Sequence, residues 1–531
     1  MRTTKFRRAR ATACRRHTVA ETATREFLHN LHELPHTVKD ACFRLGKAPE
    51  SEREESQATF HNLFLHIHSV RVHVRTLKPT LTFGLGLMAT ASFVITIITG
   101  VLLMVYYKPS TDLAYQSIKD IHFTVSTGRF IRNIHRWSAQ LMVLVVLLHM
   151  ARVFFTASYK KPREFNWLVG LGLLVITLAL SFTGYLLPWD QLAYWAITIG
   201  SNIANSPREL TDAIGITKFF DPGGFQKRLL LGANYVGQDA LIRFYVLHVF
   251  VLPLALVTLL GVHFWRIRKD GGLARPEDPM GGIAEWGGER RPVFQPLATK
   301  TYGLMALVKG KRPPVNRGPE NTVMSWPHLF WAELSVFMVT VAATLILSFY
   351  WDAPLKELAN PAIPENPAKA PWYFLGIQEL VSYSAFTGGL LIPVIVVVGL
   401  ALIPFLDRRA EGEGIWFGTK SERPIFWQSF FFASAVTVGM LAFTVNYGWL
   451  RNWFPNIHQL WIIAINPGSL LVLIFAAWSL FVLKRKDSVR LAAVSLFTCF
   501  LVAFTILTYF ATVHRGPNWH FYWWPSQWPL H

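Results

Sequence analysis

Four histidines form two pairs within apolar segments of this chain. His135 and His149 are 14 residues apart, and His248 and His263 are 15 residues apart. At 3.6 residues per turn, both spacings keep the members of a pair on one face of a helix, about 21–22 Å apart along its axis. Neutral imidazole is a common metal ligand. The spacing therefore predicts two levels at which histidines could bind a metal centre.

The two segments that carry these histidines are predicted to cross a membrane in the same direction. His135 would then meet His248 at one level, and His149 would meet His263 at the other. Two imidazoles at each of two levels are what two bis-histidine haems require, and filling both axial positions suits electron transfer. The alternative is that the histidines only form hydrogen bonds between helices. Ionisable groups inside membranes are rare and usually functional, which favours haem ligation.

Arginines and glycines near the histidines support this interpretation. Arg132 and Arg136 flank His135, and Arg152 follows His149 by three residues. A buried guanidinium needs an anion, which haem propionates would supply at each level. Glycines 14 residues apart in two other apolar segments would leave room for a flat macrocycle, although close helix packing is an alternative reason. These glycines are Gly86, Gly100, Gly170 and Gly184.

The composition indicates a polytopic membrane protein. Of 531 residues, 52% are hydrophobic and 16% charged, whereas about a quarter are charged in soluble proteins. The net charge of +20 could suggest nucleic acid, but the basic residues lie between apolar segments, so we predict no nucleic-acid partner. Because a span takes about 20 apolar residues, we predict an all-α fold with about nine transmembrane helices. These lie near 81–107, 137–157, 166–188, 243–266, 327–350, 386–406, 426–448, 459–484 and 489–512.

Lysines and arginines concentrate in alternate loops, near residues 160, 266–291, 408 and 484. This bias predicts a cytoplasmic N-terminus and places the loops 189–242 and 351–385 on the opposite, positive side. Both loops are long and rich in aromatic residues, which is typical of a binding surface. In the polar extension over residues 1–80, the segment His61–Arg75 is expected to lie along the membrane surface as a helix.

Five motifs resemble those of cytochrome b from the quinol-oxidising cytochrome bc complexes. They are RNIHRWSA (132–139), LLHMARV (147–153), KKPRE (160–164), GYLLPWDQLAYWA (184–196) and RFYVLHVFVLP (243–253). The histidine spacing and PWDQ-x-x-YWA are closer to cytochrome b6. The resemblance implies a polar extension (1–80), a b6-like dihaem four-helix bundle (81–270), a negative-side linker (271–323), a subunit IV-like domain with the quinol loop (324–484), and an extra helix with an aromatic tail (485–531).

The resemblance also implies a function. A quinol would be oxidised on the positive side of a bacterial cytoplasmic membrane, with one electron passing to a Rieske iron–sulfur protein and on to a c-type cytochrome or similar acceptor. The other electron would cross through two noncovalent b haems to a quinone near the negative side, a Q cycle that contributes to proton translocation. His135 and His248 would bind the low-potential haem, and His149 and His263 the high-potential haem. A homodimer and exchange with the quinone pool are implied by the family.

The sequence departs from the family pattern at two places. The quinol loop usually contains Pro-Glu-Trp-Tyr, but here Pro371 occupies the position of the glutamate before Trp372 and Tyr373. Because a quinol must lose protons when it is oxidised, we expect Glu379 to accept one, with Glu365 or water as alternatives. Gly84 stands where cytochrome b6 has the cysteine of its extra covalent haem. With only three cysteines and no Cys-x-x-Cys-His motif, we predict no covalent haem on this chain.

Other interpretations remain for one site and for the whole chain. Arg268, Lys269 and Asp270 follow His263 and could serve a negative-side quinone site, or they could form an ordinary positive-inside cluster. The chain could also be the dihaem quinone-reactive anchor of a dehydrogenase or hydrogenase, although four or five spans would suffice there. A haem-free transporter or scaffold is the third possibility, and the paired histidines argue against it.

Overall fold

The computed structural model describes residues 23–42, 49, 51–61, 65–274, 322–409 and 412–529. Within these ranges, nine helices are long and apolar enough to cross a membrane. This confirms the prediction of an all-α protein with nine spans. The chain divides into a small unit, Met1–Val70 with Met324–Pro327, and a large unit, Arg71–Val323 with His328–His531.

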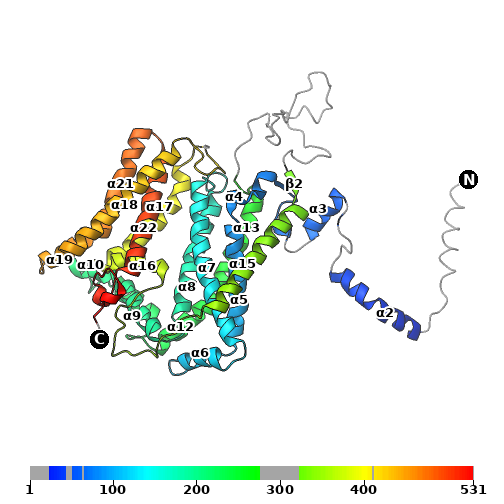
Figure 1. The fold of residues 1–531 in the computed structure, drawn as a ribbon, viewed down its shortest axis with the longest axis horizontal. Helices are drawn as coiled ribbons and strands as arrows, with labels where there is room; N and C mark the ends of the chain where they lie inside the picture. Colours follow the sequence, from blue (N-terminus) through cyan, green and yellow to red (C-terminus); the bar gives the residue numbers. More distant parts are fainter. Residues whose placement is uncertain are drawn as a thin grey trace, which may run out of the picture. The chain divides into compact units, whose positions relative to one another are not determined.

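The first four spans of the large unit pack side by side as a bundle (Figure 1). The fourth span is continuous but contains a π-helical turn, in which the amide of Leu252 donates to the carbonyl of Leu247. Pro253 explains this wider turn, since a proline has no amide to donate to the carbonyl four residues earlier. The four spans are α5 (Leu85–Met104), α7 (Gly128–Phe155), α8 (Glu164–Tyr185) and α12–η3–α13 (Gln238–Val246, Leu247–Val251, Leu252–Lys269).

The C-terminal spans lie beside this bundle (Figure 1). One of them, α15, packs on α5 and α7, while α17 packs on α8. In the last span, α22, 61% of the most apolar stretch is buried, against 6–39% in the other eight candidate spans. It packs on α18, α21 and the short helix α16 (Trp372–Val381). These spans are α15 (Phe330–Tyr350), η5–α17 (Thr387–Leu391, Ile392–Leu406), α18 (Glu422–Tyr447), α21 (Pro467–Lys486) and α22 (Val489–Val513).

Several predicted boundaries differ from the structure. The second span starts at Gly128, nine residues before the predicted start, so His135 lies well inside it. The predicted span 459–484 is divided into α20 (Gln459–Ala464) and α21. The cause is local: the side chain of Asn466 accepts from the amide of Ser469 and caps α21, and Pro467 occupies its first turn. The connections between spans also contain helices that the sequence did not predict: α6 (Ala114–Phe123), α9 (Gln191–Asn205), α10 (Pro207–Ala213), α11 (Pro222–Leu231) and α19 (Leu450–Trp453).

The prediction of a surface helix over His61–Arg75 is wrong. The described residues of this segment form the 3-10 turns η1 (Leu65–Ile67) and η2 (Val74–Leu77) and strand β1 (Arg71–His73), which pairs with β2 (Thr322–Met324). Alternating basic and β-branched residues suit a strand as well as a helix face. The remaining helices of the N-terminal part are α2 (Ala23–Cys42), α3 (Glu52–His61) and α4 (Pro79–Thr82). Most of the predicted linker 271–323 lies outside the described residues.

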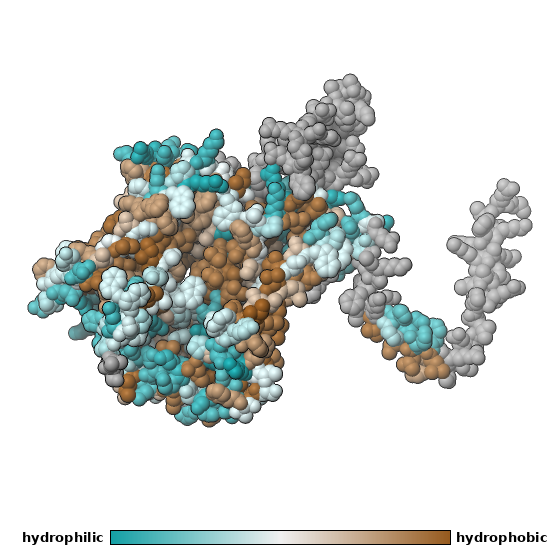
Figure 2. All heavy atoms as spheres, viewed as in Figure 1, coloured by the Kyte–Doolittle hydropathy of each residue, from teal (hydrophilic) through white to brown (hydrophobic). Residues whose placement is uncertain are grey.

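An amphipathic helix does occur in the N-terminal extension, but earlier than predicted. In α2, large apolar side chains recur every three or four residues and are more than half exposed, and Figure 2 shows them gathered on one side of the helix. This spacing is typical of a helix with one apolar face. The exposed apolar residues are Phe27, Leu28, Leu31, Leu34 and Val38.

Candidate functional site

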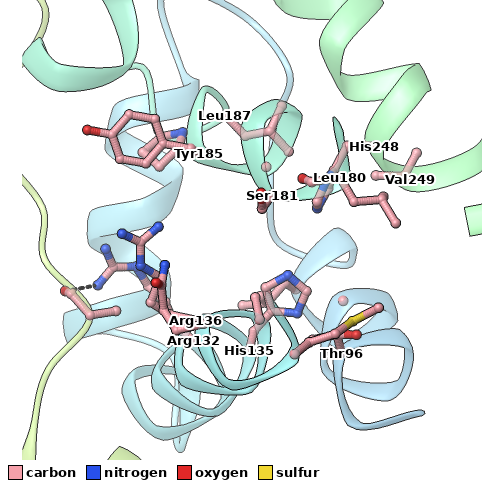
Figure 3. A pocket seen from close by; sticks show the side chains of 18 of the residues that line it. Thr96, Arg132, His135, Arg136, Leu180, Ser181, Tyr185, Leu187, His248 and Val249 are labelled. Atoms are coloured by element: carbon pink, nitrogen blue, oxygen red, sulfur yellow. Dashed lines mark hydrogen bonds between the residues drawn. The ribbon is translucent and has the colours of Figure 1, made fainter. Parts of the chain in front are cut away.

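His135 of α7 and His248 of η3 face each other across a cavity (Figure 3). Their ring centres are 6.2 Å apart and the ring planes cross at 77°. A metal–imidazole bond of about 2.0–2.1 Å, with roughly 1.1 Å from nitrogen to ring centre, puts two axial imidazoles about 6.3 Å apart. The observed separation therefore fits one iron between the two rings.

The Nδ1 atoms of both rings have hydrogen-bond partners that set the tautomer. Nδ1 of His248 lies 3.1 Å from the carbonyl oxygen of Leu180, which can only accept, so this nitrogen carries the proton. Nδ1 of His135 lies 3.0 Å from Oγ1 of Thr99, whose own hydrogen is donated to the carbonyl of Ile95. In both rings Nε2 is thereby left with its lone pair, the form that binds a metal.

The second pair, His149 of α7 and His263 of α13, lines a separate cavity of about 100 Å³. Arg152 also lines this cavity and is 3% exposed. Its Nε donates to the carbonyl of Leu81. Its Nη2 is buried without a hydrogen-bond partner among the described residues. Because an unpaired buried guanidinium nitrogen is costly, this cavity suits an anionic group such as a propionate.

Each of the four predicted glycines lies against one of the four histidines. A Cβ on Gly86 would lie 3.2 Å from Cε1 of His149, and one on Gly100 would lie 3.3 Å from Cε1 of His135. Gly170 faces His263 in the same way at 3.7 Å, and Gly184 faces His248 more closely than any of these. At Gly86, Gly100 and Gly184 an imidazole ring therefore uses the room left by the missing side chain, whereas a Cβ on Gly170 would make only an ordinary contact. Clearance for a macrocycle remains a prediction.

The two arginines beside His135 line the first cavity, which measures about 260 Å³, but they differ in their partners. Arg132 is buried and donates to the carbonyls of Ala353 and Pro354 at 2.8 and 2.7 Å. It therefore fixes the start of the 351–385 loop. Arg136 lies 5.5 Å above the ring of Tyr185, and it is the better placed of the two to bind an anion in the cavity.

Asp190 joins the two long loops next to this cavity. It caps α9 by accepting from the amide of Ala193, and its other carboxylate oxygen accepts from the amide of Lys356 at 3.0 Å. Burial raises the pKa of Asp190, and these two amide hydrogen bonds act in the opposite direction. The structure thus brings the loops 189–242 and 351–385 together at the end of the bundle that carries His135 and His248.

Helix α16 begins after Pro371 and presents its first residues to the bundle. Nε1 of Trp372 donates to Oε1 of Gln140 in α7 at 2.9 Å. Tyr373 lines the first cavity. Burial raises the pKa of its hydroxyl, while hydrogen bonds with Ser181 and Gln140 oppose that shift. The structure therefore brings Tyr373 to the cavity of the His135–His248 pair. Pro371 and Trp372 do not line this cavity, but Trp372 contacts Gln140, which does.

Glu379, by contrast, is fully buried on another side of α16. Its carboxylate accepts two hydrogen bonds from Arg515 and one from Nε1 of Trp519, at 2.5–3.0 Å. It is not among the residues that line the first cavity. The alternative acceptor, Glu365, pairs with Lys356 at 3.1 Å. The role of Glu379 as proton acceptor stays a prediction, and in the observed arrangement it would require this carboxylate to exchange partners.

The predicted negative-side residues lie at the end of α13, beside the second cavity but not lining it. Asp270 pairs with Arg266 at 2.9 Å, and the ammonium of Lys269 lies 4.7 Å from the ring centre of Trp265. The positions of Arg268, Lys269 and Asp270 agree with either a quinone site or a basic helix end.

Sequence reasoning missed several residues that complete the site. Thr99 and Thr183 both lie near an Nδ1 atom, at 3.0 and 3.2 Å. Each immediately precedes a predicted glycine, so the repeated Thr-Gly pair could have identified them. Gln140 and Arg515 carry no such signal, because their partners are 232 and 136 residues away.

Comparisons with known proteins agree with this arrangement. Residues 75–271 match the family described as Cytochrome b/b6/petB. Cytochrome b6 of Heliobacterium mobile is 44% identical over 198 residues, which are 37% of this chain and 85% of the relative. Cytochrome b6 of Prochlorococcus marinus (strain MIT 9515) is 44% identical over 189 residues, which are 36% of this chain and 81% of that relative. A solved chain of a "Hyperthermophilic respiratory Complex III" has the same fold, with a TM-score of 0.53 and 23% identity over 81% of this chain and 91% of that one. The chain belongs to the cytochrome b/b6 family.

Proposed function

We propose that this chain is the cytochrome b subunit of a quinol-oxidising bc-type complex and holds two noncovalent b haems. The observation that carries the proposal is the His135–His248 pair, whose ring separation of 6.2 Å would allow both imidazoles to hold the iron of one haem. His149 and His263 would form the second pair. When bound, the haems would supply one-electron carriers at two depths of the bundle.

The chain's own residues would hold these groups and fix their ligands. Arg136 and Arg152 would bind propionates, supported by the position of Arg136 in the cavity and by the unpaired Nη2 of Arg152. Arg132 would act mainly through the loop carbonyls to which it donates. Gly86, Gly100, Gly170 and Gly184 would allow the four imidazoles to lie close to the helix backbones.

Quinol would be oxidised where α16 meets the first cavity. Tyr373, which lines this cavity, would orient the quinol. Trp372 would act through its hydrogen bond to Gln140, with Pro371 starting the helix. Glu379 would accept a proton after exchanging its hydrogen bonds from Arg515 for one from the substrate. Arg268, Lys269 and Asp270 would serve a second quinone site near His263, where cationic and carboxylate groups can bind and protonate a reduced quinone.

The proposed orientation follows the distribution of basic residues. The end of the bundle with His135 and His248 would face the positive side of a bacterial cytoplasmic membrane, and the N-terminus would be cytoplasmic. One electron would leave to a Rieske iron–sulfur protein and a c-type cytochrome or similar acceptor, and the other would cross the bundle in a Q cycle.

Residues 81–270 would form the b6-like part, and residues 324–484 would form the subunit IV-like part. A homodimer would be the working unit.

The test is a dithionite-reduced minus oxidised spectrum of the purified complex, with haem b quantified per copy of this chain. We expect two haems that titrate at different potentials, and a well-folded preparation without haem would refute the proposal. Glu379→Gln should then lower quinol oxidation strongly while both haems remain. Near-normal turnover of that variant would rule out Glu379 as the proton acceptor without affecting the haem assignment.

A further inference from the structure

Two buried arginines, one at each end of α22, bind buried carboxylates on neighbouring helices. Near the N-terminal end, Nη2 of Arg490 lies 3.0 Å from Oε2 of Glu422 in α18. Just after the C-terminal end, Arg515 donates to both oxygens of Glu379 in α16, at 3.0 and 2.5 Å. All four residues are less than 10% exposed. A buried arginine–glutamate pair therefore attaches one end of α22 to α18 and the other end to α16.

Helix α16 lies between the dihaem bundle and α22. On one side Trp372 donates to Gln140 of α7. On another side Gly376 contacts α22 so closely that a Cβ there would lie 2.8 Å from Oγ1 of Thr508 and 3.1 Å from the carbonyl of Phe504. A side chain at this position would force Thr508 or the backbone of α22 to shift, so glycine permits the close approach of the two helices. The position of α16 relative to the cavity therefore depends on the backbone of α22.

The segment after α22 also holds the loop that leads into α16. Nζ of Lys369 donates to the carbonyl of Thr512 at 2.7 Å. The side chain of Asn366 donates to Oδ1 of Asn518 at 2.9 Å, and the amide of Asn518 donates back to Asn366. These contacts continue the connection that Arg515 makes with Glu379. Residues on both sides of Pro371 are thus attached to the C-terminal segment.

We propose that Arg515 is a positioning residue for quinol oxidation, and that α22 with residues 514–529 sets the position of Tyr373 at the cavity, and of Trp372 beside it, before Glu379 exchanges partners. This inference rests on the proposed function of that cavity. The physical reason is that a guanidinium binding both oxygens of a buried carboxylate fixes distance and orientation together. Removing the guanidinium leaves a fully buried carboxylate without its counter-charge, and the short helix that carries it must then shift or open.

The test compares Arg515→Met with Arg490→Met in the intact purified complex. The second variant is a matched control, because it breaks a buried arginine–glutamate pair of the same helix at the end away from α16. Decylubiquinol and a short-chain menaquinol serve as substrates, and the reduction of the b haems gives kcat and KM. Hydrogen–deuterium exchange of peptides from residues 372–383 reports whether α16 has loosened, and thermal unfolding reports stability.

We expect Arg515→Met to lower kcat/KM about 10- to 100-fold, mainly through KM, since small displacements of orienting groups have effects of this size. Exchange over α16 should rise while the dithionite-reduced haem spectrum stays unchanged. Arg515→Lys should recover part of the loss. Arg490→Met should lower thermal stability comparably and leave KM and the exchange of α16 within about twofold of the parent protein.

Two results would overturn the inference. The first is an unchanged KM in Arg515→Met together with a loss of thermal stability equal to that of Arg490→Met. This result would mean that the Arg515–Glu379 pair only stabilises the fold. If Arg515→Met does not assemble, Arg515→Lys keeps the positive charge but cannot bind both oxygens of Glu379 in the same way, and an unchanged KM in that variant is the second. Absence of haem or of quinol-driven reduction in the parent protein would instead refute the proposed function, so the two failures are distinguishable.

Discussion

The alanine variants of Gly184 and Gly170 provide a sharp test of how the histidines are held. Both glycines lie in α8, 14 residues apart, and each faces one imidazole. At Gly184 a Cβ would overlap Cε1 of His248 and lie 2.9 and 3.0 Å from its two nitrogens, whereas at Gly170 the nearest atom of His263 is at 3.7 Å. Ordinary Cβ contacts begin at about 3.4 Å. One substitution therefore forces a ring to move and the other does not.

The size of the effect follows from what holds the ring of His248. To make room, the ring must retreat by about half an ångström or more while its Nδ1 is bonded to Leu180. Overpacking of this kind costs about 1–3 kcal/mol, and a lost hydrogen bond adds about 1 kcal/mol. Alanine returns up to about 1 kcal/mol as a better helix former. A net cost of about 1–3 kcal/mol corresponds to an affinity for the haem at the His135–His248 pair that is about 5- to 150-fold lower.

The assay is haem b per chain, combined with a redox titration of the purified complex. We expect Gly184→Ala to approach one haem per chain, or to shift the potential of the haem that His135 and His248 share, while Gly170→Ala retains two haems at parental potentials. The reasoning would be refuted by a Gly184→Ala protein with two unaltered haems. Loss of haem from Gly170→Ala would refute it equally.

Three further predictions concern single contacts. Thr99→Val should weaken haem binding at His135 about 10- to 100-fold, since residues that hydrogen-bond a metal ligand orient it. The loss of haem during dilution into detergent measures this binding, and unchanged retention of haem would contradict the prediction. Hydrogen bonds from Arg129 and Asn133 hold the pKa of Asp352 at about 2, so its contribution to stability is present above pH 4 and lost as the pH falls through 2. Because this carboxylate is exposed, Asp352→Asn should lower the free energy of unfolding by less than about 1 kcal/mol at neutral pH. The difference in unfolding temperature between this variant and the parent protein should be smaller at pH 3 than at neutral pH. A difference that does not change with pH would contradict the stabilising role of the Asp352 carboxylate. With Gly84 in place of a cysteine, a haem stain of the denatured chain should show no band, and a positive band would contradict the prediction.

Much of the arrangement of the four histidines could be predicted from the sequence because helix geometry is regular. A spacing of 14 or 15 residues on a straight helix fixes both the face and the depth of each histidine. The structure accordingly brings His135 to His248 and places His149 and His263 at a common cavity. The glycines at the same spacing were predicted as well, but the atoms that fill the space beside them could not be, because this depends on side-chain rotamers in neighbouring helices.

The partners of Glu379 and the environment of α22 could not be predicted. Glu379 is bound by Arg515, 136 residues later, and no local pattern links the two. Hydropathy identified nine spans because a membrane crossing requires about 20 apolar residues whatever surrounds them. It could not show that the last span is the most buried of the nine candidates among the described residues. Lipid chains and protein interiors are about equally apolar, so the sequence by itself determined which segments cross the membrane and where the histidines lie along them. Only the packing of the helices decided which span lies inside and which charged residues it brings to the 351–385 loop.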